Sequence, residues 1–125
     1  MVTVLLVAVG GAVGAPLRYF VDRAVQSRHD TLFPWGTFSV NIAGSALFGV
    51  LAGGAMAGAL PESVLTVGGI GFCGALTTYS AFGYETVRLV EAGSLFYSSL
   101  NTLLSVAVGL GAAWAGLTLA SAVWA

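Results

Sequence analysis

Charge is scarce in this sequence, and lysine is absent altogether. Only 7% of the 125 residues are charged: four arginines and five acidic residues. A soluble domain carries about a quarter charged residues, so this composition excludes an ordinary soluble protein. The sequence contains neither a basic patch for nucleic acid nor a charge run typical of a disordered tail. The single cysteine, Cys73, excludes a disulfide within the chain.

Hydrophobic residues, by contrast, make up 58% of the chain. They form four stretches of at least about 20 residues, the length that a helix needs to cross a bilayer. The stretches cover approximately residues 2–20, 36–59, 63–90 and 94–124. No basic residue precedes the first stretch, so we expect a retained span and not a signal peptide. The sequence predicts one all-α domain over residues 1–125, multi-pass in the cell membrane, with both termini on the same side.

The third stretch is too long for one straight helix. At 1.5 Å per residue it would measure about 42 Å, well beyond the hydrocarbon core. Four glycines between residues 68 and 74 precede a polar cluster, and together they weaken the helix. We expect two half-helices joined by irregular backbone near residues 74–78, buried in protein or lining a wet cavity. Carbonyls freed at the end of a half-helix suit a cation.

Polar and aromatic side chains follow three of the predicted helices at helical spacing. The stripes contain Thr37, Asn41 and Ser45; Tyr79, Phe82 and Thr86; and Tyr97, Asn101 and Ser105. Such groups either bond between helices or line a narrow path through the membrane. The sequence leaves both readings open.

The stripes themselves carry no charged residue. Glu85 is the one acidic candidate, and it lies toward the end of its span, where it can also pair with Arg88. A cation pathway or a proton-coupled carrier usually has an intramembrane Asp or Glu. Amide and hydroxyl donors, together with the positive edges of aromatic rings, fit a small hard anion. The residues alone do not say which anion.

Three motifs, in order along essentially the whole chain, resemble the Fluc (CrcB) family of fluoride channels. They are Gly10-Gly11 with Gly14-Ala15-Pro16-Leu17-Arg18-Tyr19, Gly36-Thr37-Phe38-Ser39-Val40-Asn41 with Gly44-Ser45, and Gly71-Phe72-Cys73-Gly74-Ala75-Leu76-Thr77-Thr78-Tyr79-Ser80-Ala81-Phe82. The resemblance implies a fluoride-selective ion channel, not an enzyme, that exports fluoride passively and lowers cytoplasmic fluoride. It also implies an antiparallel dimer in the lipid bilayer, with two pores at the subunit interface.

The resemblance further implies a role for each of several residues, none of them catalytic. Backbone carbonyls of Gly74 and Thr77 would hold a structural sodium ion. The fluoride pore would comprise Asn41 as anion donor, Tyr79 and Phe82 as an aromatic box, and a polar track of Thr37, Tyr97, Asn101, Ser105 and Glu85. Arg18 would lie near a vestibule. The family usually has Phe at the position of Tyr79 and commonly Ser at that of Asn101.

Two alternative functions compete with the channel. A small four-helix multidrug-type exporter needs a membrane-embedded Glu in its first helix, and residues 1–17 contain no ionisable side chain. A non-transporting membrane assembly subunit would not need stacked amide groups or a broken helix. Both alternatives therefore explain less of the sequence than a channel does.

We predict a fixed orientation from the arginines. Arg23, Arg28 and Arg88 lie near the loops that follow the first and third spans, whereas the termini and the turn at Pro61 carry no arginine. By the positive-inside rule, the arginine-rich loops face the cytoplasm and both termini lie outside. Paired reporters on the C-terminus, each active on one side of the membrane, should therefore signal only from outside.

A subunit with a fixed orientation cannot form an antiparallel dimer with its own copy. The partner would then be a homologous subunit of opposite orientation. Equal signals from the two reporters would refute the fixed orientation and restore a homodimer of the chain with itself.

Overall fold

The computed structural model describes residues 1–30 and 32–124, and every regular element in this part of the chain is helical. Three elements are uninterrupted helices: α1 (Val2–Gln26), α2 (Trp35–Met56) and α6 (Leu95–Val123). The third hydrophobic stretch contains α3 (Glu62–Val64), the π-helical segment η1 (Leu65–Cys73), α4 (Gly74–Leu76) and α5 (Tyr79–Glu91). The four stretches are long and apolar enough to cross a membrane. The predicted all-α, four-span class is therefore confirmed.

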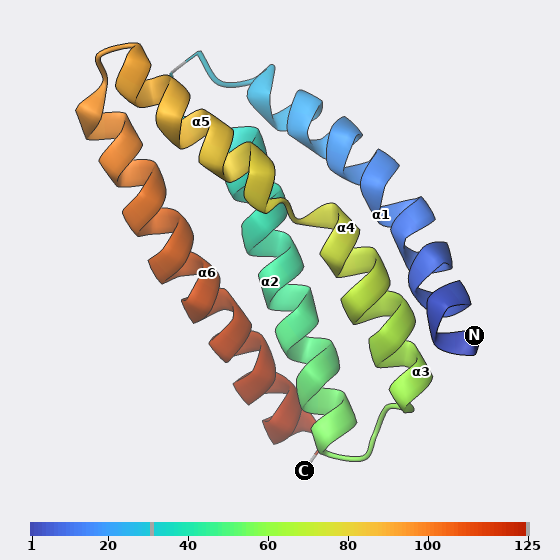
Figure 1. Ribbon diagram of the computed structural model, residues 1–125. Coiled ribbons are helices and arrows are strands. Elements are labelled where there is room, and N and C mark those ends of the chain that lie inside the picture. The colour runs from blue at the N-terminus through green and yellow to red at the C-terminus, as the bar shows by residue number, and fades with distance from the viewer. Residues whose placement is uncertain (31, 125) are drawn as a thin grey trace.

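The four stretches run alternately up and down, with α2 in the middle (Figure 1). Helix α6 packs mainly against α2, and α1 packs against η1 and α4. Both termini lie at the end of the bundle where a turn joins α2 to α3, and the loops after α1 and α5 lie at the opposite end. This is the arrangement of termini that four spans require.

Close backbone contact holds α2 to α6. A Cβ atom added at Gly49 would lie 2.2 Å from the carbonyl oxygen of Ala113, and one at Gly116 would lie 2.3 Å from that of Ala46. No side chain fits at such distances, so glycine is required at both positions. The close approach brings the polar stripe of α6 near that of α2.

The third span is interrupted at two adjacent residues. Thr77 (φ −80°, ψ 160°) and Thr78 (φ −148°, ψ 126°) have extended backbones, and α5 begins at Tyr79. The predicted break near residues 74–78 is confirmed in this pair. The wider π-helical turns of η1 were not predicted, and such turns are rare outside short functional segments. Gly71 of η1 lies against the backbone of α1, where a Cβ atom would be 2.7 Å from the Val7 carbonyl oxygen.

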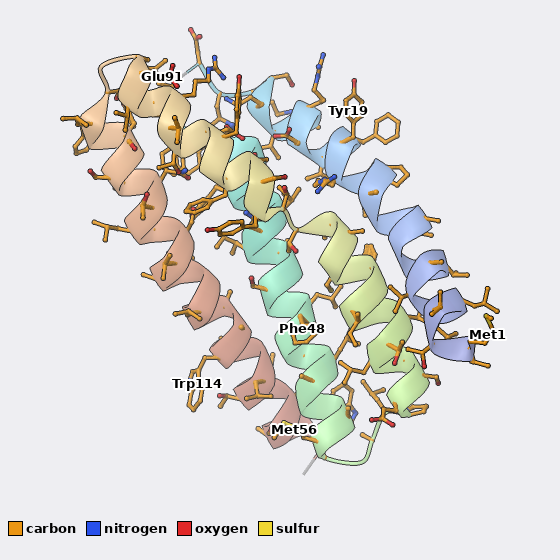
Figure 2. The ribbon with its side chains drawn as sticks, viewed as in Figure 1. Met1, Tyr19, Phe48, Met56, Glu91 and Trp114 are labelled. Carbon is orange, nitrogen blue, oxygen red and sulfur yellow. The ribbon has the colours of Figure 1, made fainter. Side chains whose placement is uncertain are left out.

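Large apolar side chains cover the outer surface of the bundle. Figure 2 shows Trp114 and Tyr19 pointing away from the helices, and both are exposed in the single chain. Among the described residues, the fully buried large side chains include Phe33, Val40 and Asn101. A small core with an apolar exterior is the arrangement expected of a chain surrounded by lipid.

Candidate functional site

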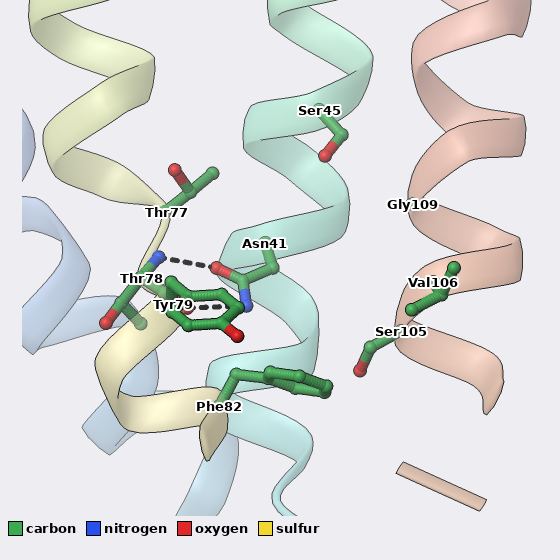
Figure 3. Close-up of a pocket in the computed structure, with 9 residues that line it drawn as sticks. All are labelled: Asn41, Ser45, Thr77, Thr78, Tyr79, Phe82, Ser105, Val106 and Gly109. Carbon is green, nitrogen blue, oxygen red and sulfur yellow. Dashed lines mark hydrogen bonds between the residues drawn. The ribbon is translucent and has the colours of Figure 1, made fainter. Parts of the chain in front are cut away.

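The side chain of Asn41 on α2 holds the break in place. The Thr78 amide donates a hydrogen bond to Asn41 Oδ1 at 2.7 Å, and Asn41 Nδ2 donates to the Thr78 carbonyl oxygen at 3.1 Å. Both bonds are drawn in Figure 3. In an uninterrupted helix the Thr78 amide would donate to the carbonyl of Gly74. The amide side chain thus replaces backbone bonds that the break removes, which makes extended backbone tolerable at membrane depth.

The break also gives the groups next to it new hydrogen-bond partners. The Ala81 amide donates to Thr78 Oγ1 at 3.1 Å, so the Thr78 side chain caps α5. The Thr77 carbonyl instead accepts a long hydrogen bond, 3.3 Å, from Nη1 of Arg18 on α1. The Thr77 carbonyl thus accepts from a side chain, and the Thr78 amide bonds to Asn41 and not to the Gly74 carbonyl.

A cavity of about 310 Å³ lies beside the break, between α2, α5 and α6. It is lined by Asn41, Ser45, Thr77, Thr78, Tyr79, Phe82, Ser105, Val106 and Gly109 (Figure 3). The ring centroids of Tyr79 and Phe82 are 6.1 Å apart, and their planes are inclined at 45°. Residues from all three predicted stripes thus meet at one cavity wall, where they present amide, hydroxyl and aromatic groups.

Two of the predicted track residues bond between helices and do not line this cavity. Thr37 is buried and donates its hydroxyl proton to Glu85 of α5. Asn101 is 1% exposed, and its Nδ2 donates to Thr86 Oγ1 at 2.9 Å. These side chains join α5 to its neighbours α2 and α6.

The remaining predicted residues lie elsewhere. Glu85 and Arg88 line a cavity of about 420 Å³ toward the loop after α1. Arg18 lines another, of about 440 Å³, on the side of the break that faces α1. The Tyr97 ring packs edge-on against Phe96, with centroids 5.3 Å apart, and lies outside the lining of all of these cavities.

The structure also shows a residue that sequence reasoning did not select. Thr78 caps α5 with its side chain and binds Asn41 with its backbone. Its signal in the sequence was a threonine directly before a helical pattern, which is a typical N-cap position. The bond to Asn41 had no such signal, because the two residues are 37 positions apart.

Four spans, a helix interrupted within the membrane and a cavity with amide and hydroxyl groups in its wall are features of membrane channels and transporters. A family model described as CrcB-like protein, Camphor Resistance (CrcB), matches residues 5–117. The chain belongs to this family, which confirms the resemblance seen in its motifs.

Curated relatives align over nearly the whole chain. It is 55% identical over 121 residues to the fluoride-specific ion channel FluC 1 of Streptomyces avermitilis, covering 97% of this chain and 98% of that one. It is also 55% identical over 125 residues to FluC 1 of Frankia casuarinae, covering 96% and 97%. The fluoride-specific ion channel FluC of Geobacter sulfurreducens is 44% identical over 118 residues, covering 94% and 95%.

The contact between Asn41 and Thr78 predicts a local effect of mutation. Replacing Asn41 with Leu keeps the branched shape of the side chain but removes the acceptor of the Thr78 amide. Hydrogen–deuterium exchange at that amide should become at least about tenfold faster, as expected for the loss of one buried hydrogen bond. Ser45→Ala, on the same wall of the cavity, is the matched control and should leave exchange at Thr78 unchanged. Equal protection of Thr78 in the Leu variant would contradict this role for Asn41.

Proposed function

We propose that this chain is a subunit of a fluoride-selective ion channel that exports fluoride passively. The observation that carries the proposal is the cavity beside the break. Its lining presents neutral donors and aromatic rings, and among the residues that the structure describes no Asp, Glu, Lys or Arg contributes to it. A fixed negative charge would repel an anion in a low-dielectric pore, and a fixed positive charge would retain it. The names of the curated relatives, fluoride-specific ion channels, support the same function.

The donors around the cavity suit a small, hard anion. Asn41 Nδ2 gives one hydrogen to the Thr78 carbonyl and has a second that can bind the ion. The ring edges of Tyr79 and Phe82 carry the positive part of the aromatic quadrupole. A hydrogen bond to a charged group contributes about 1.5–3 kcal/mol net of the water that it replaces, so each such donor favours an anion at this position.

A passive channel suffices for export. Hydrogen fluoride crosses lipid as a neutral acid and ionises inside, where the anion is trapped. A pore for the anion lets fluoride leave down its electrochemical gradient and lowers its cytoplasmic concentration. The sequence carries no nucleotide-binding motif, in agreement with a pathway that needs no ATP.

We further propose that the functional unit is an antiparallel dimer. In the single chain, Tyr79 lines the cavity and yet is 85% exposed, so one wall of the pathway is missing. A second subunit packed against this face would cover the ring and close the cavity. The arginine distribution favours a homologous subunit of opposite orientation as that partner.

We also propose that the carbonyl oxygens of Gly74 and Thr77 hold a structural sodium ion. Neutral backbone oxygens are suitable ligands for a hard cation. Apart from the chain neighbours and the helix's own backbone, no described residue has an atom within 4 Å of the Cβ position at Gly74. The Thr77 carbonyl accepts a long hydrogen bond from the positively charged Arg18, which supports its suitability for a cation. When bound, the ion would neutralise the partial negative charge of the carbonyls at the break.

Exchange of the cation tests the sodium proposal, because backbone carbonyls cannot be removed by changing a side chain. Replacing sodium with lithium on both sides of a proteoliposome should reduce fluoride efflux, since the smaller ion fits carbonyls spaced for sodium poorly. Efflux would be recorded with a fluoride electrode at constant ionic strength. Identical efflux in the two salts would refute a structural sodium ion.

Replacing Phe82 with Ile tests the proposed function directly. The change removes the ring edge and retains much of the volume, so fluoride efflux from liposomes should fall by at least about tenfold, the effect of losing one strong contact with the ion. The assay uses the purified chain, or its complex with the homologous partner if the reporters show one orientation. Phe96→Ile, an exposed phenylalanine outside the cavity lining, is the control and should conduct normally.

Three results of this assay would count against the proposal. Wild-type protein that releases no fluoride would refute the channel. Normal efflux in the Phe82 variant would mean that this ring only packs between helices. Efflux that requires a proton gradient would favour the alternative of an exporter.

A further inference from the structure

A chain of side-chain hydrogen bonds leads from the cavity into α5. Ser105 Oγ lies 3.2 Å from Asn101 Oδ1, Asn101 Nδ2 lies 2.9 Å from Thr86 Oγ1, and Thr86 Oγ1 lies 2.8 Å from the Phe82 carbonyl oxygen. Ser105 and Phe82 both line the cavity, whereas Asn101 is almost completely buried. The hydrogen-bond chain therefore begins at one residue that lines the cavity and ends at the backbone of another.

The Phe82 carbonyl, at one end of the hydrogen-bond chain, sets the direction of every bond in it. It can only accept, so Thr86 donates its single hydroxyl proton to Phe82. Thr86 Oγ1 must then accept from Asn101 Nδ2, which turns Oδ1 of the amide toward Ser105. Ser105 consequently donates its proton into the protein. It offers only oxygen lone pairs to the cavity, which is the wrong polarity for an anion.

The same four groups can also be bonded in the opposite direction. If the Asn101 amide turns over, Oδ1 accepts from Thr86 and Nδ2 donates to Ser105, whose proton then points into the cavity. The one bond lost is that from Thr86 to the Phe82 carbonyl, which as part of α5 keeps its helical partner. The bond gained, from a hydroxyl to an anion, is roughly twice as strong as a neutral one. An anion in the cavity therefore favours reversal.

We propose that Asn101 is a positioning residue that turns over to present the Ser105 hydroxyl to an anion in the cavity. This inference rests on the proposed function and concerns the regulation of the same site. The proposal also predicts a preference for fluoride over chloride. Chloride is larger and a weaker hydrogen-bond acceptor than fluoride, so it gains less from the Ser105 proton and drives the reversal less.

The first experiment observes the amide itself. Side-chain ¹⁵N–¹H signals of Asn101 would be recorded for the wild-type protein in micelles during titration with sodium fluoride, and with sodium chloride as the control. Fluoride should shift both amide protons, because their acceptors change, whereas chloride should shift them much less. Ser105→Ala removes the hydroxyl at which the hydrogen-bond chain reaches the cavity, so the response of the Asn101 amide to fluoride should disappear.

Two outcomes would overturn the inference and leave the proposed function intact. One is fluoride efflux from wild-type liposomes with no fluoride response of the Asn101 amide. The other is a response of equal size in Ser105→Ala, which would place the anion elsewhere. Wild-type protein without fluoride efflux would refute the proposed function and, with it, this inference.

A second experiment changes the relative stability of the two hydrogen-bond directions. Thr86→Val removes the bond between Asn101 and residue 86 in either direction, and it also removes the bond to the Phe82 carbonyl that only the resting direction has. The resting direction therefore loses one bond more, and the Ser105 proton should face the cavity more often. The fluoride concentration at half-maximal efflux should then fall by about threefold to tenfold, the effect of a fraction of one hydrogen bond. Thr86→Ser restores the hydroxyl and should restore the wild-type concentration.

Another threonine of the protein provides a matched control for this substitution. Thr102 on α6 makes the same kind of bond, from its hydroxyl to the Ser98 carbonyl at 3.1 Å, but lies on an exposed face away from the cavity. Thr102→Val should leave half-maximal efflux unchanged. A lower maximal efflux in Thr86→Val with an unchanged half-maximal concentration would indicate mere structural damage and overturn the proposal.

Discussion

Two hydrogen bonds between the side chain of Asn41 and the backbone of Thr78 support the interrupted helix. A backbone amide or carbonyl without a partner is costly inside a membrane, so the break at Thr77 and Thr78 needs such a replacement. Because these bonds stabilise the break, α5 can begin at Tyr79 and place the rings of Tyr79 and Phe82 beside α2. The same break frees the carbonyls that we propose as sodium ligands. The cavity, the aromatic pair and the proposed cation site thus all depend on this one contact.

Close packing of α2 against α6 is the second requirement. Glycines at positions 49 and 116 allow backbone contact, and this contact brings Ser105 to the same cavity as Asn41. Polar side chains then join α5 to both helices: Thr37 bonds to Glu85, and Asn101 bonds to Thr86. The polar groups of the bundle therefore serve both helix association and the wall of the cavity.

The sequence predicted the spans, the break and the family, and these predictions are confirmed. Periodicity also placed Asn41, Phe82 and Ser105 on helix faces that meet at one cavity. Periodicity could not separate side chains that line the cavity from those that bond beneath its wall, as Asn101 does. Helical spacing predicts on which face of a helix a residue lies, but not the exact direction of its side chain. A rotation of the helix by the width of one side chain decides whether an amide faces a neighbouring helix or an ion. The roles of these residues in conduction stay predictions.

By itself, the sequence determined that this protein crosses the membrane four times and that its third helix breaks. Hydrophobic length and glycine content are local properties, and the bilayer converts them directly into spans and weak points. Only the tertiary structure decided that Asn41 supports the break, that Arg18 reaches the Thr77 carbonyl, and that Tyr97 lies apart from the cavity. Each of these depends on how one helix is rotated and displaced against another, which is set by packing between residues far apart in the chain.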